Sequence, residues 1–260
     1  GQTIIIPVIY NAQPVLMTGA VAALTGAPWT PPPPPAQSSI AVPPRPPVLC
    51  AGCVHRAAFY AAKVATGGKA IFENDIGCYT LGYGPPYHQA DHLVCMGGGI
   101  NLAASLSRQT EQPLFAYIGD STFFHSGVTG LLNAVHGGYR FVVVILDNLT
   151  TAMTGHQPHP GTAQRAGRTY GPAKIEDLVR ACGVTHLEIL DPLDTANAVQ
   201  ALRRAIANDG MSVVLFRAPC RLHPEPPAGM AVRAPYDVAD HDCCTCGTTP
   251  DRRACAVPLD

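Results

Sequence analysis

Leu114-Phe-Ala-Tyr-Ile-Gly-Asp120-Ser-Thr is followed, after a helix-like segment, by Phe141-Val-Val-Val-Ile-Leu-Asp-Asn148. Both stretches begin with a short apolar run that is rich in β-branched and aromatic residues. Such runs are typical of parallel strands that are buried on both faces of a sheet. We therefore predict two parallel strands, over 114–118 and 141–146, each followed by an acidic or amide side chain at its carboxyl end.

The segment between these strands is predicted to be a helix. Ser126 can cap its amino end, and Gly137-Gly138 can end it. Its apolar face would consist of Val128, Leu131, Leu132 and Val135. A strand, a helix and a second parallel strand form a βαβ unit, in which ligands bind outside the carboxyl ends of the strands.

Asp120 and Asn148 both lie at this predicted ligand-binding edge. Helix N-termini and free backbone amides at such an edge suit a phosphate. A carboxylate and an amide oxygen are hard donors, and Mg²⁺ usually combines a few protein oxygens with substrate phosphates. The two residues therefore point to a metal-bridged diphosphate.

The same alternation of strands and helices continues along the chain. The other expected elements are a helix through 59–64 that ends at Gly67-Gly68, a strand at 71–72, a helix from 97–99 toward Ser107, a helix over 175–181 ended by Gly183, a strand over 186–190, a helix capped by Asp194 that runs to Ile206, and a strand over 212–216. This order predicts an α/β fold with a doubly wound, mostly parallel sheet and helices on both faces.

The composition fits one sizeable domain with appendages. The 260 residues are 47% hydrophobic and 13% charged, with a formal net charge of −1. This balance gives no reason to expect a nucleic-acid or membrane partner. Because no apolar stretch is long enough for a bilayer and residues 1–28 lack a signal-peptide pattern, we expect a cytoplasmic protein.

Three appended segments flank or precede the main domain. Residues 1–28 hold a short candidate strand and helix that cannot bury their apolar faces alone, so we interpret them as the remnant of a preceding domain. The Pro-rich residues 29–47 are predicted to be a stiff polyproline II linker. Residues 48–222 would hold the α/β domain, and residues 223–260 an irregular tail that contains Pro and Cys.

Four longer motifs follow one another along the chain. They are Asp75-Ile-Gly-Cys-Tyr-Thr-Leu-Gly82, Cys95-Met-Gly97, Gly119-Asp-Ser-Thr-Phe-Phe-His-Ser-Gly127, and Leu146-Asp-Asn through Thr154-Gly-His-Gln-Pro-His-Pro160. Together they resemble the alpha subunit of indolepyruvate ferredoxin oxidoreductases, over about residues 40–222. Gly119-Asp-Ser121 and Asp147-Asn148 are similar to the thiamine diphosphate signature Gly-Asp-Gly and Asn-Asn, although Ser121 replaces a Gly and an ordinary capped turn would also fit.

The resemblance implies a thiamine diphosphate-binding fold and a set of cofactor residues. These are Ile76, Gly77, Cys78, Met96, Gly97, Gly119, Asp120, Ser121, Thr122, Asn148, Thr150, Thr151 and Thr154. Mg²⁺ would be held by the side chains of Asp120 and Asn148 and by the carbonyl of Thr150. The hydroxyls of the three threonines Thr122, Thr151 and Thr154 could bond diphosphate oxygens or simply cap turns.

Three histidines flank the expected cofactor turns, namely His125, His156 and His159. A histidine there could move a proton or contact a substrate carboxylate, and the alternative is a hydrogen-bonded structural role. The glutamate that activates the cofactor in thiamine enzymes lies on a pyrimidine-binding domain. The family carries that domain earlier in the polypeptide, so the resemblance implies that this chain needs it from elsewhere and is inactive alone.

The cysteines divide into two groups. Cys50 and Cys53 lie before the first helix, Cys78 follows the strand at 71–72, and Cys220 follows the last predicted strand. These regions could converge near the diphosphate site, and four thiolates suffice for one [4Fe–4S] cluster. The wider 2-oxoacid ferredoxin oxidoreductase superfamily holds a cluster with a similar spacing. A structural Cys₄ zinc site and buried free thiols are the alternatives, and for Cys95 and Cys182 we expect buried thiols.

The tail carries the second group, which is Cys243, Cys244, Cys246 and Cys255. The family ends in a ferredoxin-like module with repeated Cys-x-x-Cys groups, but Thr249 stands where a third regularly spaced Cys would be. We interpret the tail as a degenerate module, and a disordered segment fits it at least as well.

The activity implied by the resemblance is oxidative decarboxylation of an aryl 2-oxoacid such as indolepyruvate to an acyl-CoA. Electrons would pass singly to an iron–sulfur cluster and then to ferredoxin, and a beta subunit would be a further partner. The cofactor would supply the carbanion chemistry and the protein the placement. Two alternatives stay open, a non-oxidative thiamine-dependent decarboxylase or synthase and a non-catalytic metal-binding fragment.

Overall fold

The computed structural model describes residues 22, 23, 25–30, 47–162, 164, 165, 168, 169, 171–223 and 230. The chain divides into two compact units, residues 1–46 and residues 47–260. Most of the predicted remnant over 1–28, most of the linker over 29–47 and all of the tail cysteines lie outside the described residues. The fold that follows is that of the second unit.

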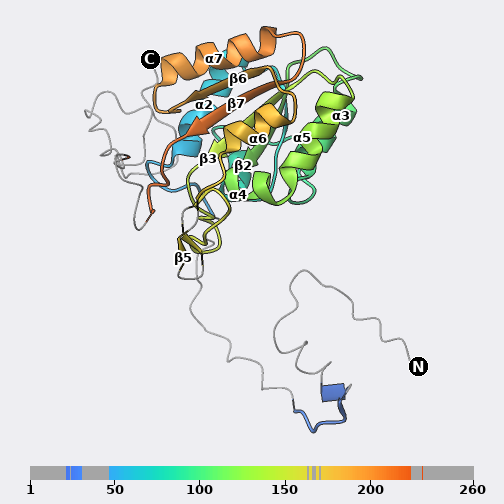
Figure 1. The fold of residues 1–260 in the computed structure, drawn as a ribbon, viewed down its shortest axis with the longest axis vertical. Helices are drawn as coiled ribbons and strands as arrows, with labels where there is room; N and C mark the ends of the chain where they lie inside the picture. Colours follow the sequence, from blue (N-terminus) through green and yellow to red (C-terminus); the bar gives the residue numbers. More distant parts are fainter. Residues whose placement is uncertain are drawn as a thin grey trace, which may run out of the picture. The chain divides into compact units, whose positions relative to one another are not determined.

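A five-stranded sheet forms the centre of this unit (Figure 1). Its strands are β1 (Ile71–Glu73), β2 (Leu114–Gly119), β3 (Val142–Asp147), β6 (His186–Leu190) and β7 (Ser212–Arg217). They run in the order β1-β2-β3-β7-β6, and every neighbouring pair is parallel. The predicted doubly wound parallel α/β fold is confirmed, as are the five strands themselves.

Helices cover both faces of the sheet. The helices α2 (Val54–Thr66) and α7 (Thr195–Ala207) share one core with Phe115, Tyr117 and Val144. The other core joins Ala116, Ile118 and Val143 to α3 (Gly98–Leu106), α5 (Val128–His136) and α6 (Ile175–Ala181). Successive residues of a strand point to opposite faces, so β2 and β3 supply side chains to both cores. This double burial explains their continuous apolar runs.

The helix after β2 begins earlier than predicted. Its first turn, α4 (Asp120–Thr122), follows β2 directly and continues through the π-helical turn η2 (Phe123–Gly127) into α5. The prediction of Ser126 as N-cap is therefore wrong, and the Ser126 hydroxyl donates instead to the carbonyl of Met96 at 3.4 Å. A π-turn within a helix is frequent at functional sites.

Most other helix ends agree with the predictions. Gly67, at φ +60°, ends α2, and the Asp194 side chain accepts from the amide of Asn197 at the start of α7. The 3₁₀ turn η1 (Cys78–Tyr83) and the short antiparallel pair β4 (Gln164–Arg165) and β5 (Arg168–Thr169) were not predicted. None of the helices that the structure describes is long and apolar enough to cross a membrane.

Candidate active site

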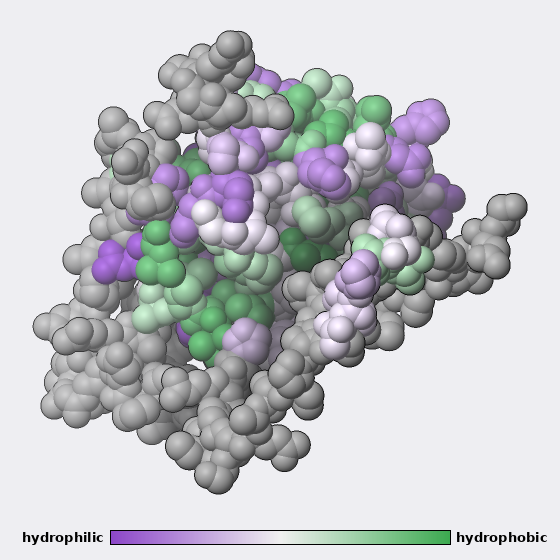
Figure 2. All heavy atoms as spheres, turned by 90° about the horizontal axis from the view of Figure 1, so that it is seen from below, coloured by the Kyte–Doolittle hydropathy of each residue, from purple (hydrophilic) through white to green (hydrophobic). Residues whose placement is uncertain are grey.

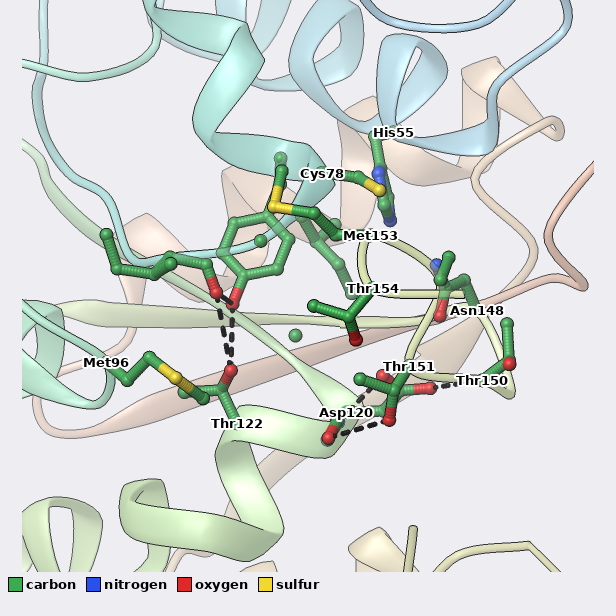
Figure 3. A pocket seen from close by; sticks show the side chains of 17 residues that line it. His55, Cys78, Met96, Asp120, Thr122, Asn148, Thr150, Thr151, Met153 and Thr154 are labelled. Atoms are coloured by element: carbon green, nitrogen blue, oxygen red, sulfur yellow. Dashed lines mark hydrogen bonds between the residues drawn. The ribbon is translucent and has the colours of Figure 1, made fainter. Parts of the chain in front are cut away.

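A pocket of about 540 Å³, counting the space open to solvent, lies where β1, β2 and β3 end (Figure 3). The predicted cofactor residues that line it are Ile76, Gly77, Cys78, Met96, Gly119, Asp120, Ser121, Thr122, Asn148, Thr150, Thr151 and Thr154. The lining residues that the sequence did not single out are His55, Tyr79, Leu146, Ala152 and Met153. The register places the ends of β2 and β3 at one edge because Gly119 pairs with Leu146.

Asp120 is the buried carboxylate of this pocket, with 3% of its surface exposed. Its Oδ1 accepts the backbone N–H of Ser121 at 2.7 Å, and its Oδ2 accepts that of Thr150 at 3.2 Å. The Nε2 atom of His159 lies 3.2 Å from the same Oδ2. These three contacts fix the direction in which the carboxylate faces the pocket.

Asn148 and Thr150 bring two more oxygens to Asp120. The amide oxygen of Asn148 faces only acceptors. Turning the amide over would let its nitrogen donate to Asp120 Oδ2 at 3.3 Å and to the Thr150 carbonyl at 2.6 Å. Assignment of an amide's two ends depends on its partners, and a cation among the three oxygens would favour the oxygen end. A carboxylate, an amide oxygen and a carbonyl so close together fit Mg²⁺, which prefers oxygen ligands.

The turn after β3 has the backbone shape that this arrangement needs. Leu149 has φ +65°, a conformation that bulky residues rarely adopt. Its own amide donates to Oδ1 of Asp147 at 3.3 Å, and the next amide, that of Thr150, reaches Asp120. The two carboxylates thus hold the turn from both sides.

A charged network lies directly behind the pocket. Asp147 is buried, and Arg217 Nε donates to its Oδ2 at 2.6 Å while the Arg217 guanidinium also bonds both carboxylate oxygens of Glu176. Burial and the charge of Asp120 raise the pKa of Asp147 to about 6, and Arg217 opposes that shift. The positive charge of Arg217 therefore offsets the negative charges of Asp147 and Glu176 beside the candidate metal ligands.

The glycine turn before α3 does not face the pocket. Both carboxylate oxygens of Asp75 accept the amide of Gly97, at 2.9 and 2.8 Å, and one of them accepts that of Gly99 at 3.4 Å. The protein's own carboxylate therefore occupies this helix N-terminus. Gly97 is thus the one predicted cofactor residue that is not among the lining residues, whereas the neighbouring Met96 is.

Tyr79 closes one wall of the pocket. Its hydroxyl oxygen lies 2.9 Å from the carbonyl oxygen of Ile76 and 3.3 Å from Oγ1 of Thr122, and these two contacts tie the loop after β1 to α4. A Cβ atom on Gly119 would lie 2.5 Å from the Tyr79 ring. The close approach of this ring thus requires a glycine at position 119.

The predicted histidines differ in their positions. His125 is exposed, and neither it nor His156 lines the pocket. The His156 ring is 3.4 Å from the Thr150 hydroxyl, and His159 contacts Asp120 itself. The histidine that does line the pocket is His55, which the sequence analysis did not single out. Burial lowers the pKa of His55 to about 4, so its ring is neutral at pH 7.

The four cysteines predicted to bind a cluster lie near one another. Burial raises the pKa of the Cys53 thiol to about 12, and the neighbouring thiols of Cys50, Cys220 and Cys78 raise it further. Arg56 donates to the carbonyls of Leu49 and Cys50, and the amide of Cys220 donates to the carbonyl of Asn148 at 3.0 Å. Among the described residues, no three His, Cys, Asp or Glu side chains stand at metal-binding distances.

The other two described cysteines behave differently from each other. Cys182 is buried, as predicted, and its thiol donates to the carbonyl of Val128 at 3.8 Å. The prediction of a buried thiol is wrong for Cys95, which is exposed. Cys95 lies in the turn that leads into α3, where its carbonyl accepts the amide of Gly98.

Comparison with known proteins agrees with this geometry. Residues 52–216 match the family described as thiamine pyrophosphate enzyme, C-terminal TPP binding domain. The chain belongs to this family. The match covers every strand of the sheet except the last residue of β7, and it contains all of the pocket-lining residues.

Two curated relatives of this TPP-binding domain are both named indolepyruvate oxidoreductase subunit IorA. The protein from Methanothermobacter marburgensis is 42% identical over 242 residues, which is 90% of this chain and 39% of the relative. The protein from Archaeoglobus fulgidus is 49% identical over 183 residues, 69% of this chain and 29% of the relative. The chain thus spans about two fifths or less of the length of these relatives.

A solved structure shows the same fold. It is the 2-oxoglutarate:ferredoxin oxidoreductase from Magnetococcus marinus, with a TM-score of 0.62 and 15% sequence identity. The superposition covers 75% of this chain and 74% of that chain.

Proposed function

We propose that this chain is the diphosphate-binding part of a thiamine-dependent 2-oxoacid:ferredoxin oxidoreductase that uses an aryl pyruvate such as indolepyruvate. The observation that carries the proposal is the convergence of Asp120, Asn148 and the Thr150 carbonyl in the pocket of a TPP-binding domain. The IorA names of the relatives support the substrate class. Residues 48–222 would form the cofactor domain, which agrees with the division of the chain before residue 47.

The chain's own residues would bind and orient the cofactor. Asp120, Asn148 and the Thr150 carbonyl would hold Mg²⁺ beside the diphosphate, and Mg²⁺ prefers such oxygen ligands. Tyr79 and Met96 would contact the organic part, because they supply an aromatic ring and a thioether to the wall. Bound thiamine diphosphate supplies carbanion stabilisation, and the protein supplies binding and electrostatics.

We further propose that Cys50, Cys53, Cys78 and Cys220 hold one [4Fe–4S] cluster, which would take electrons from the cofactor site and pass them to ferredoxin. Support comes from the mutual proximity of their thiols and from Cys78, which also lines the pocket. Because the thiols do not stand at metal-binding distances in the structure, the loops that carry them would have to move to close around a cluster. Because the described cysteines are free, a reducing cytoplasm suits the protein.

A partner domain would complete the site. The pocket mouth carries the exposed side chains of Met96 and Met153, and the face seen from below shows hydrophobic patches among polar ones (Figure 2). Exposed apolar groups at a pocket favour a covering partner. We propose that a pyrimidine-binding domain occupies this position and supplies the activating glutamate, while CoA, a beta subunit and ferredoxin join the full enzyme.

Two measurements test the proposed function. The 260-residue chain should bind thiamine diphosphate by calorimetry in the presence of Mg²⁺ and much less with EDTA; no binding in either case would contradict the assignment. Adding the pyrimidine-binding domain, on a longer chain or a second one, should give 2-oxoacid- and CoA-dependent reduction of a low-potential dye. Turnover at full rate by the chain alone would show that no partner domain is needed.

A further inference from the structure

His55 has a buried side chain without a hydrogen-bond partner. It is the second residue of α2, 3% of its surface is exposed, and it lines the pocket. Neither Nδ1 nor Nε2 has a partner among the described residues, where the only other orphaned buried side-chain atom is Oε2 of Glu73. Buried polar groups in proteins are nearly always hydrogen-bonded. The His55 ring faces a pocket, and both of its nitrogens lack a hydrogen-bond partner. This arrangement indicates that a ligand bound in the pocket supplies the missing partner.

The ring of His55 lies against the loop after β1 and is affected by the charge of Asp120. Figure 3 shows the ring of His55 pointing into the pocket next to Cys78. Tyr79 packs against it edge to face, with ring centroids 5.9 Å apart. The charged group that acts on the ring is the carboxylate of Asp120, the candidate magnesium ligand.

The pocket has few free donors for a ligand that carries several negative charges. Among the described residues that line it there is no Lys or Arg. The hydroxyl of Thr151 donates to Ser121 at 2.9 Å, that of Thr154 to Gln157 at 2.5 Å, and that of Thr122 to the carbonyl of Ile76 at 3.4 Å. A neutral imidazole has one N–H donor, and in the part of the chain that the structure describes the His55 N–H has no acceptor.

We propose that His55 is a cofactor-binding residue whose ring N–H donates a hydrogen bond to a diphosphate oxygen of thiamine diphosphate. The inference rests on the proposed function, since it needs the diphosphate beside Asp120. Diphosphate oxygens accept without donating, and a hydrogen bond to a charged acceptor is among the stronger ones. The second ring nitrogen then accepts from a water or from a donor on the ligand.

The test uses the full chain with Mg²⁺ and three probes, namely thiamine diphosphate, inorganic pyrophosphate and thiamine. His55→Phe keeps a flat ring and removes the donor, so it should raise the dissociation constants of thiamine diphosphate and pyrophosphate about tenfold or more. Thiamine binding should not change. His55→Gln keeps an N–H group and should recover most of the loss. His136→Gln, on the exposed end of α5, is the matched control and should bind like wild type.

Other outcomes overturn the inference in distinguishable ways. Equal affinities of wild type and His55→Phe for thiamine diphosphate and pyrophosphate would show that His55 donates no hydrogen bond to the diphosphate. A loss for thiamine diphosphate without a loss for pyrophosphate would place the ring against the organic part of the cofactor. If wild type binds neither phosphate probe, the proposed function itself fails and this inference fails with it. Circular dichroism checks folding, and His55→Met replaces His55→Phe if the latter unfolds.

Discussion

The backbone amide of Thr150 donates to Oδ2 of Asp120 at 3.2 Å, across 30 positions of sequence. This bond joins the turn after β3 to the first residue of α4. It also leaves the Thr150 carbonyl on the side of the Asn148 amide, where the three candidate magnesium oxygens meet. The proposed metal site would thus depend on the pairing of β2 with β3, since that pairing sets the distance between the two turns.

Replacing Asp120 tests the metal assignment directly. Asp120→Ala removes the one charged oxygen of the donor set, so Mg²⁺-dependent binding of thiamine diphosphate should weaken at least tenfold, or about 1.4 kcal/mol. Isothermal calorimetry measures the change. Asp177→Ala, which removes the same charge from an exposed position of α6, serves as the control. An unchanged affinity of Asp120→Ala for thiamine diphosphate would show that Asp120 is not a ligand of the metal.

The sequence predicted the strands well because each central strand is buried on both faces. Val143 and Val144 have no exposed surface, so no polar residue interrupts the run. The common location of the side chains at the strand ends could be predicted from the parallel order of the strands, which brings all carboxyl ends to one edge of the sheet. Asp120 and Asn148 could therefore be identified before their contacts were known.

Features that depend on tertiary contacts could not be read from local patterns. Ser126 has the residue type of an N-cap, but the helix begins at Asp120, whose carboxylate accepts the amides of Ser121 and Thr150. Arg217 meets Asp147 only because β3 and β7 are adjacent and these two residues are in register. His55 became visible as a candidate only when its ring was found without a partner.

Gly119 offers a steric test of the pocket wall. Its φ of −82° suits any residue, so Gly119→Ala costs no backbone strain, but the new Cβ would lie 2.5 Å from the Tyr79 ring. The ring must move, and we expect a loss of about 1–3 kcal/mol in the free energy of unfolding together with weaker cofactor binding. Gly84→Ala is the control, because no atom of the described residues lies within 4 Å of a Cβ built there. Equal urea midpoints for the two variants would contradict the close packing.

Arg217 is predicted to stabilise the fold through Asp147 and Glu176. Arg217→Met leaves the buried Asp147 carboxylate without its 2.6 Å partner, so the free energy of unfolding should fall by about 3–5 kcal/mol. Arg217→Lys keeps the charge but loses the forked geometry of the guanidinium, so its free energy of unfolding should lie between those of wild type and Arg217→Met. Urea unfolding at pH 7 measures both, and a loss below about 1 kcal/mol in Arg217→Met would show that the network is not stabilising.

Asp147 also predicts a pH dependence of stability. Burial and the charge of Asp120 raise its pKa from 3.8 to about 6, so the folded protein binds this proton more tightly than the unfolded chain does. Its contribution to stability is therefore full below about pH 4 and is lost as the pH rises through about 6. The free energy of unfolding of wild type minus that of Asp147→Asn should fall over this range. A difference that is constant with pH would mean that the pKa is not raised.

The last prediction concerns the two groups of cysteines. If Cys50, Cys53, Cys78 and Cys220 hold one [4Fe–4S] cluster, anaerobically reconstituted protein should contain about four irons per chain. Cutting the chain after Pro235 removes the tail cysteines and should leave that number unchanged. Cys78→Ser should abolish or destabilise the cluster, because it removes one of only four ligands. Cys95→Ser, which changes an exposed cysteine outside the set, is the matched control.

The opposite pattern would relocate the cluster. Loss of iron with the tail, and its retention in Cys78→Ser, would assign the iron to Cys243, Cys246 and Cys255. Zinc in place of iron after anaerobic preparation would favour a structural Cys₄ site and remove the electron-transfer role. Thiamine diphosphate binding measured on the same samples separates the sites, since Cys78→Ser removes a cluster ligand while the oxygens of Asp120, Asn148 and Thr150 remain in place.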